Sequence, residues 1–217
     1  MQAEGTVRGT GGVRVVDYDC GTDVPGLYAA GDTATRELIC GGFTGGGSHN
    51  AAWAASSGSW AGHAAATFAI RRGRRAAALR AVGGAGLRPD GPFGLDYRAV
   101  TAAVQRHVLP HEHNFLRHGD QLNPALQSLH DIWSAVRASL GATGEDTFRA
   151  REAAAMAAHS RWMYHAALER TETRGMHKRV DHPVQDAAQR YRLLTGGLNE
   201  LWTRPERVGA AVGGRAA

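Results

Sequence analysis

The sequence contains little lysine and cysteine, and it has no long apolar run. Lys178 is its only lysine, and Cys20 and Cys40 are its only cysteines. Two cysteines so placed form neither a metal-binding pattern nor a disulfide framework. No segment reaches the roughly 18 consecutive apolar residues of a membrane span. The residues after Met1 lack the basic start and apolar core of a signal peptide. We therefore expect a cytoplasmic protein without a membrane span of its own.

Positive charge exceeds negative charge, but its distribution does not indicate a nucleic-acid partner. The formal net charge is +5, and most of the arginines stand singly or beside acids. The one dense cluster, Arg71–Arg75, lies where a helix is expected to end, and cations there complement the helix dipole. A basic balance without interleaved aromatics or a recognisable module is weak support for nucleic-acid binding. We expect no nucleic-acid partner.

The first part of the chain is expected to form strands followed by a helix. Val13–Tyr18 alternates weakly and is rich in β-branched residues, which favours a strand or hairpin arm. Leu27–Ala30 is a short apolar run typical of a buried strand. Either Ser48 or Asn50 can cap a helix that runs to about Arg72.

From Tyr97 onward the apolar positions recur with a helical period, which predicts a small bundle. The expected inward positions are Val100, Val104 and Val108, then Leu122, Leu126, Leu129, Ile132, Trp133 and Val136, then Ala154, Ala155, Ala158, Trp162 and Ala166. Thr195–Leu198 and Trp202–Pro205 are expected to form a tail that packs on this bundle.

We therefore predict an α+β protein with four parts. These are a strand–loop–helix segment of a cofactor-binding domain (1–72), a linker rich in glycine, alanine and arginine (73–94), a helical domain (95–208) and a disordered tail (209–217).

Two glycine-rich elements suggest a cofactor. The apolar run Gly26–Asp32 ends in a glycine turn that presents one carboxylate. The segment Gly41–Gly47 is rich in glycine, so few side chains cover the backbone just before the next helix. Such a loop lets a flat, polar cofactor approach the N–H groups of a helix N-terminus. The sequence has no Gly-x-Gly-x-x-Gly dinucleotide fingerprint to complete the site. These elements therefore look like half of a site.

Three motifs carry a resemblance to a known family. Val24–Asp32 reads VPGLYAAGD, Gly46–Ala52 reads GGSHNAA, and Ala167–Pro183 reads ALERTETRGMHKRVDHP. They resemble, in this order, the VPGLYAAGE segment, the loop-to-helix element before the flavin and the ESRGAHxRxDxP signature of one group of flavoproteins. The chain is similar to the C-terminal part of the flavoprotein subunits of the fumarate reductase/succinate dehydrogenase family, which includes L-aspartate oxidase and the adenylylsulfate reductase α subunit.

The resemblance implies FAD as cofactor and assigns residues to it. Asp32 occupies the position of the acid that binds ribityl or ribose hydroxyls, one methylene shorter. The backbone after the glycine loop would direct its N–H groups at the N1/O2 edge of the flavin. His49 could act as an acid or base there, or it could cap the helix or pack beneath the ring. The implied cofactor-binding residues are Gly31, Asp32, Gly46, Gly47, Ser48, His49, Asn50 and Ala51.

The substrate-binding residues of the dicarboxylate reductases are not present. The His and Arg of their His-Gly-Ala-Asn-Arg segment align with Gly41 and Gly45, and a second substrate element aligns with Val7–Gly12 without its His and first Thr. Glycine cannot replace the charged clamp of an arginine. Fumarate or succinate as substrate is therefore not supported.

Two further clusters have two interpretations each. The charged residues around Glu172, Arg174 and Arg179 could be a solvated helix end with paired charges. The resemblance implies instead buried ion pairs at the junction of the helical and flavin domains, with the two arginines bordering the active-site cleft. His111 and His113 alternate as metal ligands would, but the segment is structural in the family. We expect no metal site.

The resemblance implies an oxidoreductase that transfers hydride through FAD and passes electrons to an iron–sulfur partner. Without the dinucleotide motif and the capping domain of the family, we expect the isolated chain to be inactive. Three explanations stay open. The chain is a fragment of a longer flavoprotein, one half of a split enzyme completed by another chain, or a non-catalytic remnant whose helical domain serves as a protein-interaction module.

Overall fold

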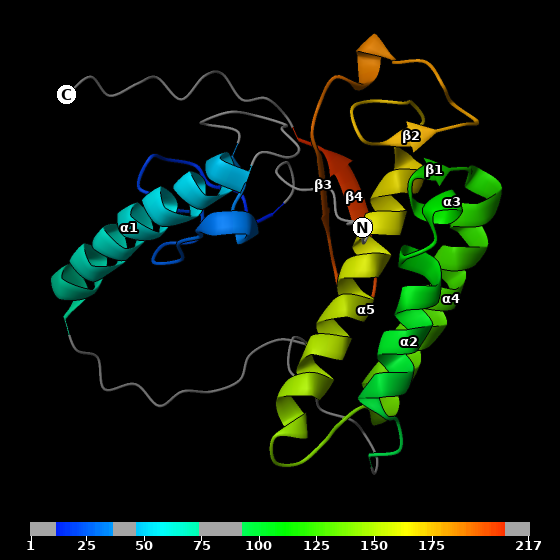
Figure 1. Cartoon of the computed structure of the whole chain (residues 1–217), viewed down its shortest axis with the longest axis horizontal. Coiled ribbons are helices and arrows are strands. Elements are labelled where there is room, and N and C mark those ends of the chain that lie inside the picture. The colour runs from blue at the N-terminus through cyan, green and yellow to red at the C-terminus, as the bar shows by residue number, and fades with distance from the viewer. Residues whose placement is uncertain (1–11, 37–46, 74–92, 207–217) are drawn as a thin grey trace. The chain divides into compact units, whose positions relative to one another are not determined.

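The computed structural model describes residues 12–36, 47–73 and 93–206, without the side chains of residues 47–49 (Figure 1). The chain divides between Arg80 and Ala81 into two compact units, each with its own packed residues. We describe each unit by itself.

The first unit packs a folded-back segment against one long helix. A 3-10 turn, η1 (Gly31–Thr33), contacts helix α1 (Gly47–Arg72). The buried apolar residues are Val15, Cys20, Ala29, Ala34, Trp53 and Ala61. On α1 the buried residues recur every four positions, so one face of the helix covers the segment. The helix ends as predicted at Arg72, and Gly73 follows with a φ of 68° and an N–H that donates to the Ala69 carbonyl at 3.0 Å.

The strands expected in this unit are not formed. Val13–Tyr18 makes one parallel bridge, between Val13 and Ala34, and the Leu27–Ala30 run makes one antiparallel bridge, between Tyr28 and Gly21. Positive φ angles at Cys20, Gly26 and Gly31 reverse the direction of the chain within a few residues. Each run therefore meets another run at a single pair. A ladder needs several successive pairs, so the strand prediction was wrong here.

The helix cap was also misplaced. Because α1 begins at Gly47, Ser48 and Asn50 lie inside its first turn and not at the cap position.

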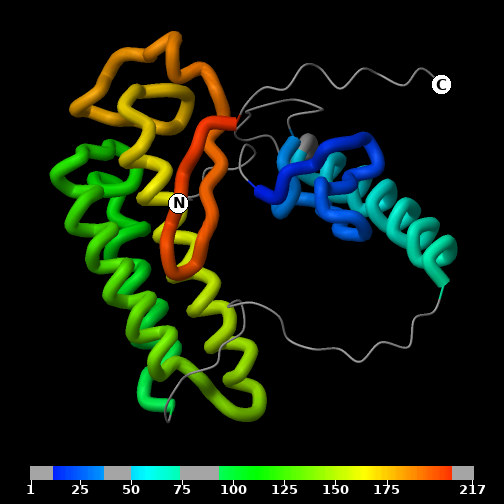
Figure 2. Tube along the Cα trace, turned by 180° about the vertical axis from the view of Figure 1, so that it is seen from behind, coloured from blue at the N-terminus to red at the C-terminus, as the bar shows by residue number. Residues whose placement is uncertain are grey.

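The second unit is a helical bundle with two small sheets (Figures 1 and 2). Its elements in chain order are α2 (Tyr97–Val108), α3 (His111–Asn114), β1 (Leu116–Arg117), α4 (Gly119–Ser139), α5 (Asp146–Glu169), β2 (Lys178–Arg179), η2 (Ala187–Gln189), β3 (Leu193–Gly196) and β4 (Trp202–Pro205). Helices α2, α4 and α5 lie side by side, and the core forms between them. The mixture of helices with small sheets confirms the expected α+β class.

Two of the three predicted apolar stripes form this core. Val100 and Val104 of α2 are buried, and α4 buries Leu122, Leu129, Trp133 and Val136. The stripe predicted for α5 was right in part. Ala154 and Ala158 are buried as predicted, but Ala155 is exposed, and the core also includes Ala150, Ala153 and Ala157. Helix α5 carries alanine on several faces, so alanine spacing does not identify the side that packs on α2 and α4.

One of the two sheets joins segments that are distant in sequence, and the other is a local hairpin. Strands β1 and β2 pair in parallel, with Leu116 opposite Lys178 and Arg117 opposite Arg179. Strands β3 and β4 form an antiparallel hairpin that lies along α5 in both views (Figures 1 and 2). The sequence predicted a tail that packs on the bundle, and the packing is present. The hairpin itself was not predicted.

Side chains of α5 hold the hairpin in place. Trp162 Nε1 donates to the Gly197 carbonyl at 2.6 Å, and Arg161 donates to the carbonyls of Leu198 and Asn199. The ring nitrogen Nδ1 of His165 lies 2.8 Å from the Thr203 hydroxyl. The hairpin is thus attached through its connecting loop and through β4.

Candidate functional site

The Gly31 turn is attached to the N-terminal half of α1. The Gly31 N–H donates to Ser57 Oγ at 2.9 Å, and Trp53 Nε1 donates to the Gly31 carbonyl at 2.8 Å. The Ser57 hydroxyl in turn donates to the Trp53 carbonyl. Gly31 has a φ of 62°, which a side chain would strain. The turn is therefore fixed on both sides, and the exposed carboxylate of Asp32 follows it.

A second connection reaches the first turn of α1. Arg36 Nη1 donates to Asn50 Oδ1 at 2.6 Å. Trp53 and Ser57 lie about one and two turns further along the same helix. The segment that contains Asp32 is therefore bound to α1 near the helix N-terminus, where unpaired N–H groups and the helix dipole favour negative charge.

The implied cofactor-binding residues are partly brought together. Gly31 and Asp32 lie on η1, which contacts α1, and Asn50 and Ala51 lie in the first two turns of α1. Gly47, Ser48 and His49 belong to the first turn as backbone positions, and the orientation of the His49 side chain lies outside the described structure. Gly46 lies outside the described residues, as do Gly41 and Gly45.

Sequence reasoning missed Arg36, Trp53 and Ser57, which hold this arrangement. Their partners are 14 to 26 residues away along the chain. The only available signal was the four-residue spacing of Trp53 and Ser57, which puts them on one helix face.

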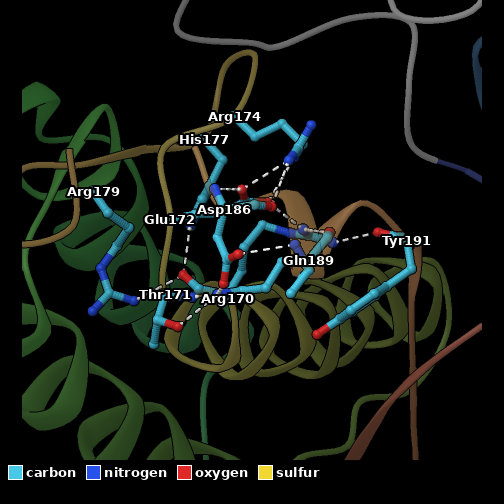
Figure 3. Close-up of polar contacts among 10 residues, drawn as sticks. Arg170, Thr171, Glu172, Arg174, His177, Arg179, Asp186, Gln189 and Tyr191 are labelled. Carbon is cyan, nitrogen blue, oxygen red and sulfur yellow. Dashed lines mark hydrogen bonds and ion pairs between the residues drawn. The ribbon is translucent and has the colours of Figure 1, made fainter. Parts of the chain in front are cut away.

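Two residues of the predicted charged cluster, Glu172 and Arg174, belong to a network around the buried carboxylate of Glu172 (Figure 3). Glu172 is fully buried and accepts from Arg174 Nε at 2.6 Å, Arg174 Nη2 at 2.9 Å, Arg170 Nη1 at 2.7 Å and the Asp186 N–H at 2.7 Å. The hydrogen bonds from Arg174 lower the pKa of Glu172 to about 2, with further contributions from the Asp186 N–H and Arg170.

The same arginines bind the chain that follows. Arg170 also donates to the carbonyls of Gln189 and Tyr191, at 2.9 and 2.7 Å, and Arg174 donates to the Asp186 carbonyl at 3.0 Å. The network therefore attaches residues 186–191 to the C-terminal end of α5, as Figure 3 shows.

Arg179 belongs to a different ion pair. It binds both carboxylate oxygens of Asp181, at 2.8 Å each, and donates to the Ala167 carbonyl at 2.8 Å in the last turn of α5. Asp181 also accepts from the Gly119 N–H at 2.9 Å, at the start of α4. Arg179 lowers the pKa of Asp181. The pair thus satisfies the C-terminal end of one helix and the N-terminal end of another.

His177, which the sequence did not single out as a site residue, is held in one tautomer. Its Nδ1 lies 2.9 Å from Arg117 Nη1 and its Nε2 lies 3.1 Å from the Arg170 carbonyl. Because a guanidinium only donates, Nδ1 accepts and Nε2 carries the proton. Burial, together with the nearby charges of Arg117 and Arg179, lowers the pKa of His177 to about 4.

The histidine pair that suggested metal ligation is placed in α3. His111 stacks on Phe115 with ring centroids 4.7 Å apart. Across the described ranges, no group of three or more His, Cys, Asp or Glu side chains could hold a metal ion. Nor is any helix in those ranges both long and apolar enough to cross a membrane.

Comparison with protein families finds sequence similarity in the second unit, and comparison with solved structures finds fold similarity that extends over both units. Residues 104–196 match the family described as fumarate reductase flavoprotein C-term. No sequence among curated proteins matches the chain.

Two solved structures are similar. An E. coli quinol fumarate reductase FrdA with the E245Q mutation has a TM-score of 0.66 and 16% identity, over 89% of this chain and 35% of that one. The Mycobacterium smegmatis Sdh1 complex in the apo form has a TM-score of 0.53 and 23% identity, over 85% of this chain and 33% of that one. At these identities the likeness concerns the fold alone, and the chain spans about a third of the length of either.

The family match begins within α2 and covers α3, α4, α5, the β1–β2 pair, the Glu172 network and the first strand of the hairpin. It confirms the resemblance that the motif at Ala167–Pro183 indicated. Residues 104–196 are therefore similar to the C-terminal part of fumarate reductase flavoproteins, and the fold of the chain is similar to that of the two flavoprotein structures.

Proposed function

We propose that the chain is the C-terminal portion of an FAD-dependent oxidoreductase and that its first unit contacts the flavin. The observation that carries this proposal is the attachment of the Gly31 turn to α1 through Ser57 and Trp53. It combines an exposed acid, Asp32, with a helix N-terminus in one small unit. That combination suits a cofactor with hydroxyl groups on one side and a negative edge on the other.

The residues that the structure describes fit one edge of FAD. The exposed Asp32 carboxylate is an acceptor for ribityl or ribose hydroxyls. The first turn of α1 offers backbone N–H groups and the positive end of the helix dipole to the N1/O2 edge of the ring. Bound FAD would supply hydride transfer with a substrate and electrons for an iron–sulfur partner. Gly31 would keep the Asp32 carboxylate at a fixed place relative to α1.

A complementary protein portion would have to provide the rest of the FAD site. The chain spans 35% and 33% of the two similar structures. In the folded-back segment of the first unit, Tyr18, Val24 and Leu27 are 72%, 53% and 48% exposed. Apolar side chains concentrated in one short segment are typical of a surface that another chain or domain covers. We propose that this portion binds here, that the assembly acts in the cytoplasm, and that the chain alone is inactive.

Co-expression tests the proposal. The full chain is purified alone and together with the products of the neighbouring reading frames, and each preparation is examined for the visible absorption of flavin. We expect a colourless chain alone and a coloured complex. Asp32→Ala should lower the flavin retained by the complex, while Asp23→Ala, which removes an exposed carboxylate from the same segment, should not. Equal retention by both variants would remove the role of Asp32.

A non-catalytic interaction module is the second candidate. One observation favours it, because the second unit buries 15 apolar residues in a core of its own. This candidate predicts that the second unit folds without the first and that no co-expressed product yields a coloured complex.

A further inference from the structure

Arg36 is a buried cation with few partners. Its side chain is 2% exposed. Nη1 donates to Asn50 Oδ1 at 2.6 Å. Nη2 is buried and has no hydrogen-bond partner within the described part of the chain. A guanidinium has five N–H donors and keeps its charge at all physiological pH values.

Among the residues that the structure describes, none supplies a counter-charge to the Arg36 guanidinium. Asn50 is neutral, so its oxygen supplies a hydrogen bond but no counter-charge. Arg161 and Arg179 of the second unit are as buried, yet Arg161 has carbonyls and an imidazole as acceptors and Arg179 has a carboxylate. Buried donors without acceptors and buried charges without counter-charges are unfavourable. The free Nη2 therefore indicates a missing acceptor.

The position of Arg36 identifies the sign of that acceptor. Asn50 lies in the first turn of α1, so its hydrogen bond to Arg36 holds the guanidinium at the helix N-terminus. The backbone N–H groups of that turn and the helix dipole also favour an anion. Two independent features, a buried guanidinium with a free Nη2 and a helix N-terminus, thus demand negative charge at one place.

We propose that Arg36, Asn50 and the first turn of α1 form a binding site for a small oxyanion. A carboxylate or a phosphate would accept from Nη2 and from the helix N–H groups in a charge-assisted geometry. The site lies at the helix end to which we assign the flavin, but the inference uses only the contacts of Arg36 and does not require FAD.

The test uses the full chain without flavin, inorganic phosphate and acetate as probes, and chloride at equal ionic strength as the reference. Binding is measured by calorimetry, and thermal unfolding is measured in the same solutions. A ligand that binds only the folded state stabilises it by RT ln(1 + [L]/Kd) and so raises the unfolding temperature. We expect phosphate or acetate to raise the unfolding temperature more than chloride does. The anion with the larger effect indicates whether the site prefers a phosphate or a carboxylate.

Two variants locate the effect. Asn50→Asp places a carboxylate where Oδ1 already meets Nη1, so the chain supplies its own anion to Arg36. We expect this variant to unfold at a higher temperature in chloride and to bind the probes at least tenfold more weakly. Arg71→Gln changes the net charge by the same amount at the exposed far end of α1 and should bind as the parent does. Binding of equal strength in Asn50→Asp and the parent, or no response to either oxyanion, would overturn the proposal. Neither result would bear on the flavin.

Discussion

Arg174 grips both oxygens of the Glu172 carboxylate, with Nε at 2.6 Å from Oε1 and Nη2 at 2.9 Å from Oε2. Arg170 adds a third charged donor at 2.7 Å. The carboxylate is fully buried, so its charge depends on these partners. Glu172 is therefore the centre of the contacts that join the end of α5 to residues 186–191.

Glu172→Gln should destabilise the second unit strongly. The amide keeps the shape but removes the charge, and one of its N–H groups faces a guanidinium. Breaking a buried pair on one side costs about 3–5 kcal/mol, and urea unfolding of the full chain followed by circular dichroism measures it. The control is Glu152→Gln, which removes an exposed partner of Arg149 and should cost less than about 1 kcal/mol. Equal losses in both variants would contradict the role assigned to Glu172.

Stability should fall when the pH drops below about 6.5, in part through His177. The pKa of this group is about 4 in the folded chain and 6.5 in its ordinary state, so the unfolded state binds the proton first. The contribution is complete above the ordinary pKa and is lost as the pH falls toward 4. Linkage gives about 2 kcal/mol between pH 7 and pH 5.

The His177→Gln variant should lack this component of the pH dependence, while His159→Gln, at an exposed position, should retain it. Proton NMR of the imidazole provides the direct measurement. A midpoint near 6.5 for His177 would refute the prediction.

Gly197→Ala should detach the hairpin from α5. Gly197 has a φ of 86°, and an added Cβ would collide with the Glu200 carbonyl oxygen. Gly175 is the matched control, because its φ is 58° but a Cβ there meets nothing within 4 Å. Gly175→Ala should cost about 1–2 kcal/mol for the backbone alone, and Gly197→Ala should cost more. Hydrogen exchange of the β3 and β4 amides should accelerate only in Gly197→Ala, and the idea fails if the two variants behave alike.

Ser57→Ala should loosen the Gly31 turn without touching the proposed flavin site. The change leaves the partly buried Gly31 N–H without its acceptor, at a cost of about 1–3 kcal/mol. Ser59→Ala, two positions further at an exposed site, should be close to neutral. Thermal unfolding of the full chain compares the two. The coloured complex formed with Ser57→Ala should also retain less flavin. If this variant lost stability but kept its flavin, the Gly31 turn would have no role in cofactor binding.

The sequence predicted the elements whose signal is local. The period of Val100 and Val104 located α2, and the arginines at Arg71 and Arg72 located the end of α1. The motif at Ala167–Pro183 indicated that Glu172 and Arg174 belong to one charged cluster. These features depend on spacing within a few residues, which a single sequence displays directly.

The remaining features depend on contacts that a single sequence does not display. Ser57 is an ordinary helix serine until Gly31, 26 residues earlier, donates to it. The inward face of α5 is decided by its neighbours, because alanine fits any face. Val13–Tyr18 has strand-like composition but only one bridge partner, so its propensity was overruled by the turns around it.

The parallel pairing of β1 with β2 would help to hold the second unit together after proteolytic cleavage of its backbone. β1 precedes α4, β2 follows α5, and the exposed stretch at Thr143 and Gly144 joins the two helices. Proteolysis there would produce two pieces that remain bound through the packed helices, the β1–β2 pair and the bond from Gly119 to Asp181. The unit would then behave as a noncovalent complex of its own fragments, and its halves could be exchanged between molecules only by unfolding.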